Sequence, residues 1–116
     1  MSRDARLWLQ DIAQGCAKVG RYVEGMTFEA FVADERTYDA VLRNLELVGE
    51  AAKHLPDEEV AIMPGLDWRG IRGLRDVIAH GYFGLDDGIL WDVICNRLPP
   101  LERTVAARLG QLTPPP

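Results

Sequence analysis

The residues best suited to chemistry in this chain lie close together, at residues 75–82. Arg75, His80 and Tyr82 interrupt an otherwise apolar segment there, and Asp76 follows the arginine. Arginine carries a permanent positive charge on a planar fork of donors that fits phosphate oxygens, and histidine exchanges protons near neutral pH. The combination predicts a site for chemistry on a phosphodiester. The alternative is that the arginine and the histidine are only surface or capping residues of one helix.

Apolar residues at helical spacing predict the elements that must position this segment. The pattern predicts helices over residues 4–24 and 68–80, a central helix from its cap at Asp34 to Leu55, and short helical turns at 27–31 and 57–65. Side chains predicted to cap these elements are those of Thr27, Asp34, Asp57 and Asp67.

A last helix begins at Asp86 or Asp87, runs to Ile94 and resumes at residues 101–109, and the prolines at 99 and 100 should bend or break it. No segment shows the two-residue period of strands. The sequence therefore predicts an all-α fold, an up-and-down bundle of four long helices with short extra helical turns.

Composition limits the kind of protein this is. The 116 residues, 47% of them hydrophobic, suit one domain over residues 1–112, followed by a disordered proline-rich tail at 113–116. No apolar run is long enough for a membrane helix, and the first residues lack an apolar leader, so we expect a cytoplasmic protein with no membrane partner. Cys16 and Cys95 belong to no ligand cluster, so no metal is expected. The net charge of −5 argues against an overall basic nucleic-acid binder, so any RNA contact must use a local patch.

The chain resembles the HepT-like toxins of the HEPN superfamily of α-helical ribonucleases. The resemblance is carried by the pattern Arg, four residues, His, any residue, Tyr at residues 75–82, which continues as GYFGLD at 81–86. Further segments in family order are YVEGMTF at 22–28, DERT at 34–37, LRNLE at 42–46 and GEAA at 49–52. An aspartate at position 76 departs from the commonest pattern, in which asparagine or another polar residue follows the arginine.

This resemblance implies a function and a set of partners. It implies a HEPN-like bundle that acts as a metal-independent endoribonuclease, needs no cofactor, and forms a homodimer whose cleft brings two copies of the 75–82 segment together. It further implies the toxin of a type VII toxin–antitoxin system. The partner would be an MntA-like nucleotidyltransferase antitoxin, which attaches AMP to Tyr82 and so inactivates the toxin.

Helical geometry bears on how Arg75 and His80 act as the catalytic pair. At about 100° per residue, Tyr82 falls on nearly the same face as Arg75, whereas His80 lies about 140° away. Either the long arginine side chain wraps toward the histidine, or the helix loosens at Gly81, or a second protomer completes the site, and we favour the last two together. Cleavage by the 2′-hydroxyl needs a base and an acid, which the two copies of His80 supply, while Arg75 stabilises charge on the phosphate.

Two neighbouring residues are predicted to support this site. Asp76 lies four residues before His80 and either orients the imidazole or is a solvated carboxylate paired with Arg72. Arg72 and Arg69 either form the local RNA patch or are solvated arginines.

Polar residues of the central helix have their own alternatives. Arg43 could pair with Glu46 or Glu50 inside the dimer cleft, or these residues form an exposed polar face. His54 is expected to cap the carbonyl end of the helix.

Two other classes of function remain open at this level. One is a non-catalytic HEPN-like bundle that binds a nucleotide or serves as an adaptor for a nucleotidyltransferase, with Arg75 only gripping a phosphate. The other is a plain helical interaction module. The intact set of Arg75, His80 and Tyr82 favours the ribonuclease.

Overall fold

The computed structural model describes residues 3–80 and 85–112, and all of its regular elements in these ranges are helices. The helices in chain order are α1 (Ala5–Tyr22), α2 (Phe28–Ala33), α3 (Glu35–Lys53), α4 (Asp57–Ile62), α5 (Trp68–Arg72), α6 (Leu74–His80), α7 (Asp87–Asp92), the π-helix η1 (Val93–Arg97) and α8 (Leu98–Gln111). The predicted all-α fold class is confirmed.

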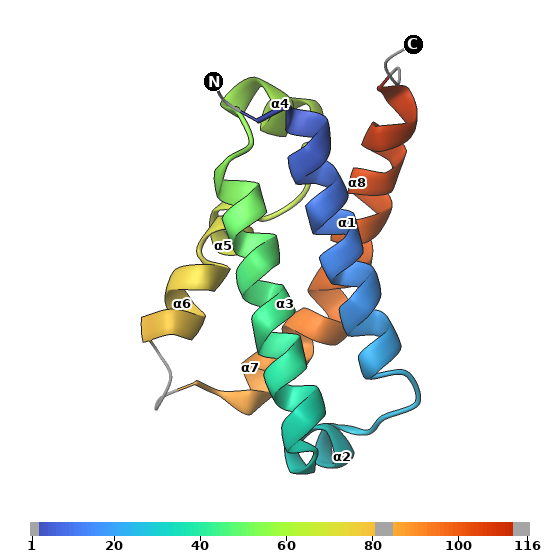
Figure 1. Ribbon diagram of the computed structural model, residues 1–116, viewed down its shortest axis with the longest axis vertical. Coiled ribbons are helices and arrows are strands. Elements are labelled where there is room, and N and C mark those ends of the chain that lie inside the picture. The colour runs from blue at the N-terminus through green and yellow to red at the C-terminus, as the bar shows by residue number, and fades with distance from the viewer. Residues whose placement is uncertain (1–2, 81–84, 113–116) are drawn as a thin grey trace.

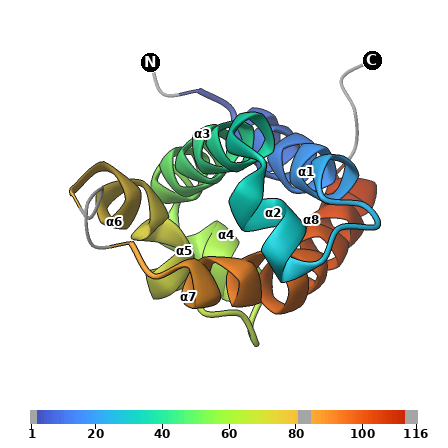
Figure 2. The ribbon, with the colours of Figure 1, turned by 90° about the horizontal axis from the view of Figure 1, so that it is seen from below.

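Helices α1 and α3 run antiparallel through the middle of the molecule (Figure 1). Helix α8 packs against α1, whereas α5 and α6 pack against α3, so that α6 lies at the outer edge of the bundle. The view from below shows α2 crossing the end of the bundle, where it contacts α3 and α7 (Figure 2). This arrangement leaves one side of α6 without a neighbouring helix in the described residues.

The core lies where the apolar stripes of α1 and α3 meet. Leu9 and Ile12 of α1 and Val41, Leu45 and Val48 of α3 are fully buried. These residues belong to the stripes that the helical period predicts, because residues three, four and seven apart share one face of a helix. Burial of each such side chain contributes about 1.5–3 kcal/mol to folding.

Aspartate and threonine caps fix most helix starts. The side chains of Thr27, Asp34 and Asp67 accept hydrogen bonds from backbone N–H groups in the first turns of α2, α3 and α5, as predicted. The prediction for Asp57 is wrong: Pro56, in an extended conformation, is the N-cap of α4, and Asp57 is the first helical residue.

The prediction of a single helix over residues 68–80 is also wrong, because the structure has two helices there, divided at Gly73. Gly73 is the C-cap of α5, and its N–H donates to the carbonyl of Arg69 at 3.1 Å. Helix α6 starts at the next residue. Glycine is a weak helix former, and the change of direction lets both α5 and α6 contact α3.

The prolines at 99 and 100 do not break the last helix. Residues 87–111 are helical without a gap, and the turn before the prolines widens to a π-helix at Val93–Arg97. The N–H of Leu98 donates to the carbonyl of Val93, five residues back. The π-turn accommodates the two prolines at the start of α8. In a regular α-helix their rings would clash with the preceding turn, and their missing N–H groups would leave carbonyls of that turn without donors.

Gly49 sets how closely the start of α6 approaches α3. A Cβ atom at this position would lie 2.8 Å from the backbone nitrogen of Arg75 and 3.1 Å from Cβ of Leu74. Real Cβ atoms do not come this close to backbone atoms. The absence of a side chain at Gly49 therefore places the Arg75 backbone directly against α3.

Replacing Gly49 with alanine is expected to lower the free energy of unfolding by about 1–2 kcal/mol, since overpacking outweighs the gain in helix propensity. Urea unfolding followed by circular dichroism measures the change. Gly20→Ala in α1 is the matched control, because a Cβ atom there meets nothing within 4 Å. We expect this control to gain up to about 1 kcal/mol. An equal gain in both variants would show that Gly49 is not needed for close approach.

Candidate active site

Arg75 lies in the first turn of α6 and reaches back to α3. Its Nε atom is 3.2 Å from Oε2 of Glu50, and its Nη1 atom is 3.7 Å from Oδ1 of Asp76. The side chain remains 49% exposed. Arg75 is thus held by two carboxylates and still half exposed to solvent.

His80 is the last residue of α6 and is exposed. Its Nδ1 atom lies 3.0 Å from the backbone carbonyl oxygen of Asp76. A carbonyl oxygen only accepts, so this contact is a hydrogen bond when Nδ1 carries the proton. In the neutral imidazole the lone pair is then on Nε2. In this tautomer Nε2 is the nitrogen that accepts a proton.

The Asp76 carboxylate is solvated, with its side chain 51% exposed, but it contacts neither the His80 imidazole nor Arg72. Its Oδ2 atom is 3.5 Å from Nζ of Lys53, and its Oδ1 atom faces Arg75. The contact with His80 comes from the backbone carbonyl of Asp76 and not from its carboxylate. The carboxylate points toward α3 because Lys53 offers it a positive charge there.

Arg72 does not pair with Asp76 either. Its Nε atom donates to the carbonyl of Ala52 at 3.0 Å, and its Nη2 atom donates to the carbonyl of Leu55 at 2.8 Å. Nη1 is 3.5 Å from Oδ1 of Asp57. These bonds satisfy carbonyls at the end of α3 and tie α5 to it, so Arg72 supports the site through the scaffold.

The polar residues near the end of α3 are arranged around Glu50. Of the alternatives for these residues, an ion pair of Glu50 with Arg43 is not found in the described residues, and Glu50 pairs with Arg75. Nδ1 of His54 lies 2.8 Å from the backbone carbonyl of Glu50, in the capping position expected of it. The His54 ring stacks on Trp8 of α1, with 4.3 Å between ring centroids.

Tyr82 and Gly81 lie outside the described residues. The structure therefore gives no position for the phenol oxygen relative to Arg75 or His80, and α6 is described up to His80.

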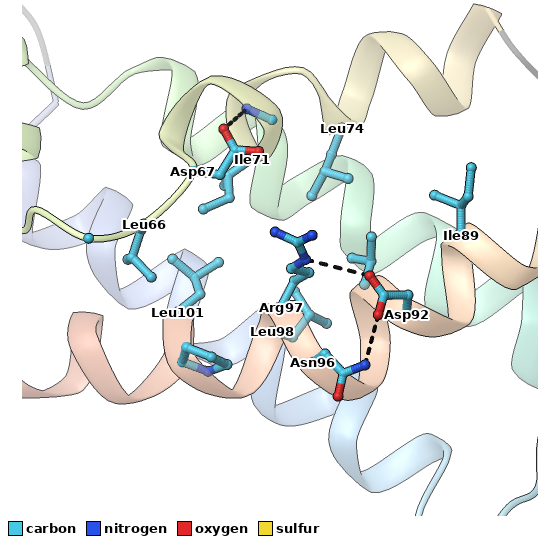
Figure 3. A pocket seen from close by; sticks show the side chains of 14 residues that line it. Leu66, Asp67, Ile71, Leu74, Ile89, Asp92, Asn96, Arg97, Leu98 and Leu101 are labelled. Carbon is cyan, nitrogen blue, oxygen red and sulfur yellow. Dashed lines mark hydrogen bonds and ion pairs between the residues drawn. The ribbon is translucent and has the colours of Figure 1, made fainter.

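A pocket of about 500 Å³ lies elsewhere, between α5 and the α7–η1–α8 segment (Figure 3). Its wall is mostly apolar, and Arg97 reaches into it from η1, with Nε 3.5 Å from Oδ2 of Asp92. Leu74 faces this pocket, whereas Arg75 and His80 are not among its lining residues. The pair with the chemistry of a phosphodiester site is on the outer surface of α6, and we assign the candidate active site to that surface.

Two residues next to Arg75 and Asp76 were not linked to them by the sequence. Glu50 and Lys53 are 25 and 23 positions earlier in the chain, and each meets its partner across the contact between α3 and α6. Spacing within one helix carries no signal for such pairs, so only the packing of the two helices reveals them.

The described residues offer neither a metal site nor a membrane span. No group of three or more His, Cys, Asp and Glu side chains in residues 3–80 and 85–112 is placed to hold a metal ion. Across the same ranges, no helix combines the length and the apolar character that crossing a membrane demands.

Comparison with known proteins gives consistent family matches. The model of the family described as "Ribonuclease HepT-like" matches residues 12–108. "Probable ribonuclease HepT" of Thermococcus cleftensis is 34% identical over 102 residues, which cover 88% of this chain and 93% of that protein. A "Putative RNase" of Methanocaldococcus jannaschii is 38% identical over 84% of this chain and 80% of its own length.

A third relative, a "Putative RNase" of Caldanaerobacter subterraneus subsp. tengcongensis, is 39% identical over 86% of this chain and 89% of its own length. No solved structure matches the chain. The family match spans most of the chain and includes both Arg75 and His80. On this evidence the chain belongs to the HepT-like ribonuclease family of HEPN proteins.

Proposed function

We propose that this protein is the toxin of a type VII toxin–antitoxin system, a metal-independent endoribonuclease that a nucleotidyltransferase antitoxin inactivates by attaching AMP to Tyr82. Membership of the HepT-like ribonuclease family supports the ribonuclease activity. The names of the relatives from Thermococcus cleftensis and Methanocaldococcus jannaschii, which describe them as ribonucleases, agree with this activity.

The observation that carries the proposal is the placement of both His80 and Arg75, exposed, on the short helix α6. Nδ1 of His80 lies 3.0 Å from the Asp76 carbonyl oxygen, and in the tautomer with the proton on Nδ1 it is Nε2 that transfers protons. Arg75 adds a permanent charge and donor groups at the start of the same helix, half exposed to solvent. One group moves protons and the other stabilises negative charge on a phosphate.

The reaction needs two histidines and so two protomers. The 2′-oxygen of the RNA attacks the adjacent phosphorus, and Nε2 of His80 in one protomer takes the 2′-hydroxyl proton. The bond from phosphorus to the 5′-oxygen breaks, and the imidazolium of the partner's His80 protonates that oxygen. The products are a 2′,3′-cyclic phosphate and a 5′-hydroxyl. Arg75 stabilises the charge that builds on the phosphate oxygens.

RNA binding in a chain of net charge −5 needs a local patch of positive charge. Arg75, Lys53 and Arg69 are exposed on α6, α3 and α5. These helices are neighbours. We infer that the backbone of the RNA follows this side of the bundle.

The direct test is RNA cleavage by the purified protein in the presence of EDTA. We expect cleavage to persist, with 2′,3′-cyclic phosphate ends identified by mass spectrometry, because imidazole groups carry the proton transfers. Addition of the cognate nucleotidyltransferase with ATP should stop it. A strict need for a divalent ion, or products that carry 5′-phosphates, would contradict this mechanism.

Tyr82→Phe tests the regulatory part of the proposal. This variant keeps the aromatic ring but has no acceptor oxygen, so it should cleave RNA and stay active when the nucleotidyltransferase and ATP are added. An AMP group adds negative charge and bulk that compete with RNA for the site. Mass spectrometry should find the adduct on the wild-type protein alone. An adduct on Tyr82→Phe would place the acceptor at another residue.

A further inference from the structure

Four charged side chains connect α3 to α6 around the candidate active site. Glu50 and Lys53 come from the last turns of α3, and Arg75 and Asp76 come from the first turn of α6. Glu50 contacts Arg75 at 3.2 Å, Asp76 contacts Lys53 at 3.5 Å, and Arg75 and Asp76 approach each other at 3.7 Å. The charges alternate, so each side chain has a neighbour of opposite sign.

Glu50 contacts the Arg75 guanidinium at the nitrogen nearest its side-chain stem. The short contact joins Oε2 of Glu50 to Nε, the nitrogen nearest the aliphatic stem. A guanidinium offers five N–H donors in a rigid plane, so fixing Nε fixes the direction of the other two nitrogens. The contact between Arg75 and Glu50 involves Nε, the one with Asp76 involves Nη1, and the side chain as a whole is 49% exposed. The exposed part of the fork is accessible to a ligand.

Glu50 is itself held from the other side. His54 binds the Glu50 backbone carbonyl through Nδ1 at 2.8 Å, and its Nδ1 atom is 3.8 Å from the Glu50 carboxylate. Stacking on Trp8 fixes the His54 ring against α1. Gly49, the residue before Glu50, brings the Arg75 backbone against α3. Packed elements thus place both Glu50, which is the acceptor, and the backbone of Arg75, which is the donor.

We propose that Glu50 is a positioning residue, which aims the terminal edge of the Arg75 guanidinium at the scissile phosphate; the proposal rests on the ribonuclease function proposed above. Glu50 need not touch RNA. Without it, the long side chain of Arg75 samples several rotamers and presents the fork in the right direction only part of the time. A misplacement of about 1 Å can cost on the order of a hundredfold in rate.

A role in stability does not account for this contact. The side chains of Glu50 and Arg75 are 40% and 49% exposed, and ion pairs at such positions contribute little to folding because water and salt screen them. Removing the charge of Glu50 should therefore leave the unfolding transition close to that of the wild type. The effect should fall on the geometry of Arg75.

The test compares Glu50→Gln with Glu46→Gln in steady-state RNA cleavage. Glu46 lies one turn earlier on α3, and no ion pair is recorded for it within the described ranges. We expect Glu50→Gln to lower kcat about tenfold or more with KM within about twofold, because alignment matters most in the transition state. Glu50→Asp keeps the charge and should recover part of kcat. Glu46→Gln should match the wild type.

A second measurement tests the contact between Glu50 and Arg75 in the absence of RNA. The order parameter of the Arg75 Nε–H group, obtained by nuclear magnetic resonance, should be high in the wild type and in Glu46→Gln and should fall in Glu50→Gln. Equal kcat values for the two glutamine variants, or an unchanged Arg75 order parameter, would overturn the proposal. Wild-type protein that cleaves no RNA would refute the proposed function, whereas the order parameter would still decide whether Glu50 holds Arg75.

Discussion

Replacing His80 with asparagine is expected to lower the rate of RNA cleavage by about 10²–10⁴-fold, the range that general acid–base catalysis contributes. The side-chain N–H₂ of asparagine can replace Nδ1–H as the donor to the Asp76 carbonyl, so the end of α6 keeps its contact. Asparagine has no nitrogen that exchanges a proton near neutral pH. The loss would therefore report the chemistry of Nε2 and not a change of structure.

Single-turnover cleavage of a labelled RNA measures this loss, with circular dichroism and urea unfolding as checks of the fold. His80→Ala removes the contact as well and should be no more active than His80→Asn. His80 is exposed and outside the apolar core, so both variants should unfold near the wild-type midpoint. Cleavage at the wild-type rate by a folded His80→Asn protein would remove His80 from the mechanism.

The second large effect is expected at Arg75. Arg75→Ala should reduce kcat by about 10²–10³-fold, the usual cost of removing a donor that stabilises negative charge in a transition state. Arg75→Lys keeps a positive charge but lacks both the planar fork and the Nε atom that contacts Glu50. We expect it to recover only a small part of the loss.

Arg103→Lys provides the matched control for this substitution. Arg103 is exposed on α8, which does not pack against α6, so its replacement should leave cleavage unchanged. Measuring kcat and KM separately for the three variants distinguishes lost transition-state stabilisation from lost RNA binding. If Arg75→Lys were as active as the wild type, a point charge alone would suffice and the geometry of the fork would not matter.

Local chemistry allowed much of the fold to be predicted. The helical period identified the buried faces of α1 and α3, because residues on one face of a helix share one environment. The caps at Thr27, Asp34 and Asp67 were also predicted correctly, since a capping side chain bonds a backbone N–H only two or three residues away. Helical period and capping depend only on residues that are close together in the sequence, so the sequence alone reveals them.

The misplaced helix boundaries have long-range causes. Gly73 divides the predicted 68–80 helix where α5 and α6 turn along the surface of α3, and a lone glycine is otherwise tolerated inside a helix. The prolines at 99 and 100 are accommodated by a π-turn, so that the chain from α7 to α8 stays helical. Whether a weak helix former bends, widens or breaks a helix depends on what packs beside it.

The sequence by itself determined the helical class of this protein and singled out the candidate site residues, Arg75 and His80. Only the tertiary structure decided what those residues touch. Arg72 binds the carbonyl end of α3 instead of Asp76, and Glu50 binds Arg75 across two helices. These partners are separated by about twenty positions or more, and their contact depends on the close approach that Gly49 permits. A pattern of residue types cannot specify such a distance, because it follows from how whole helices pack.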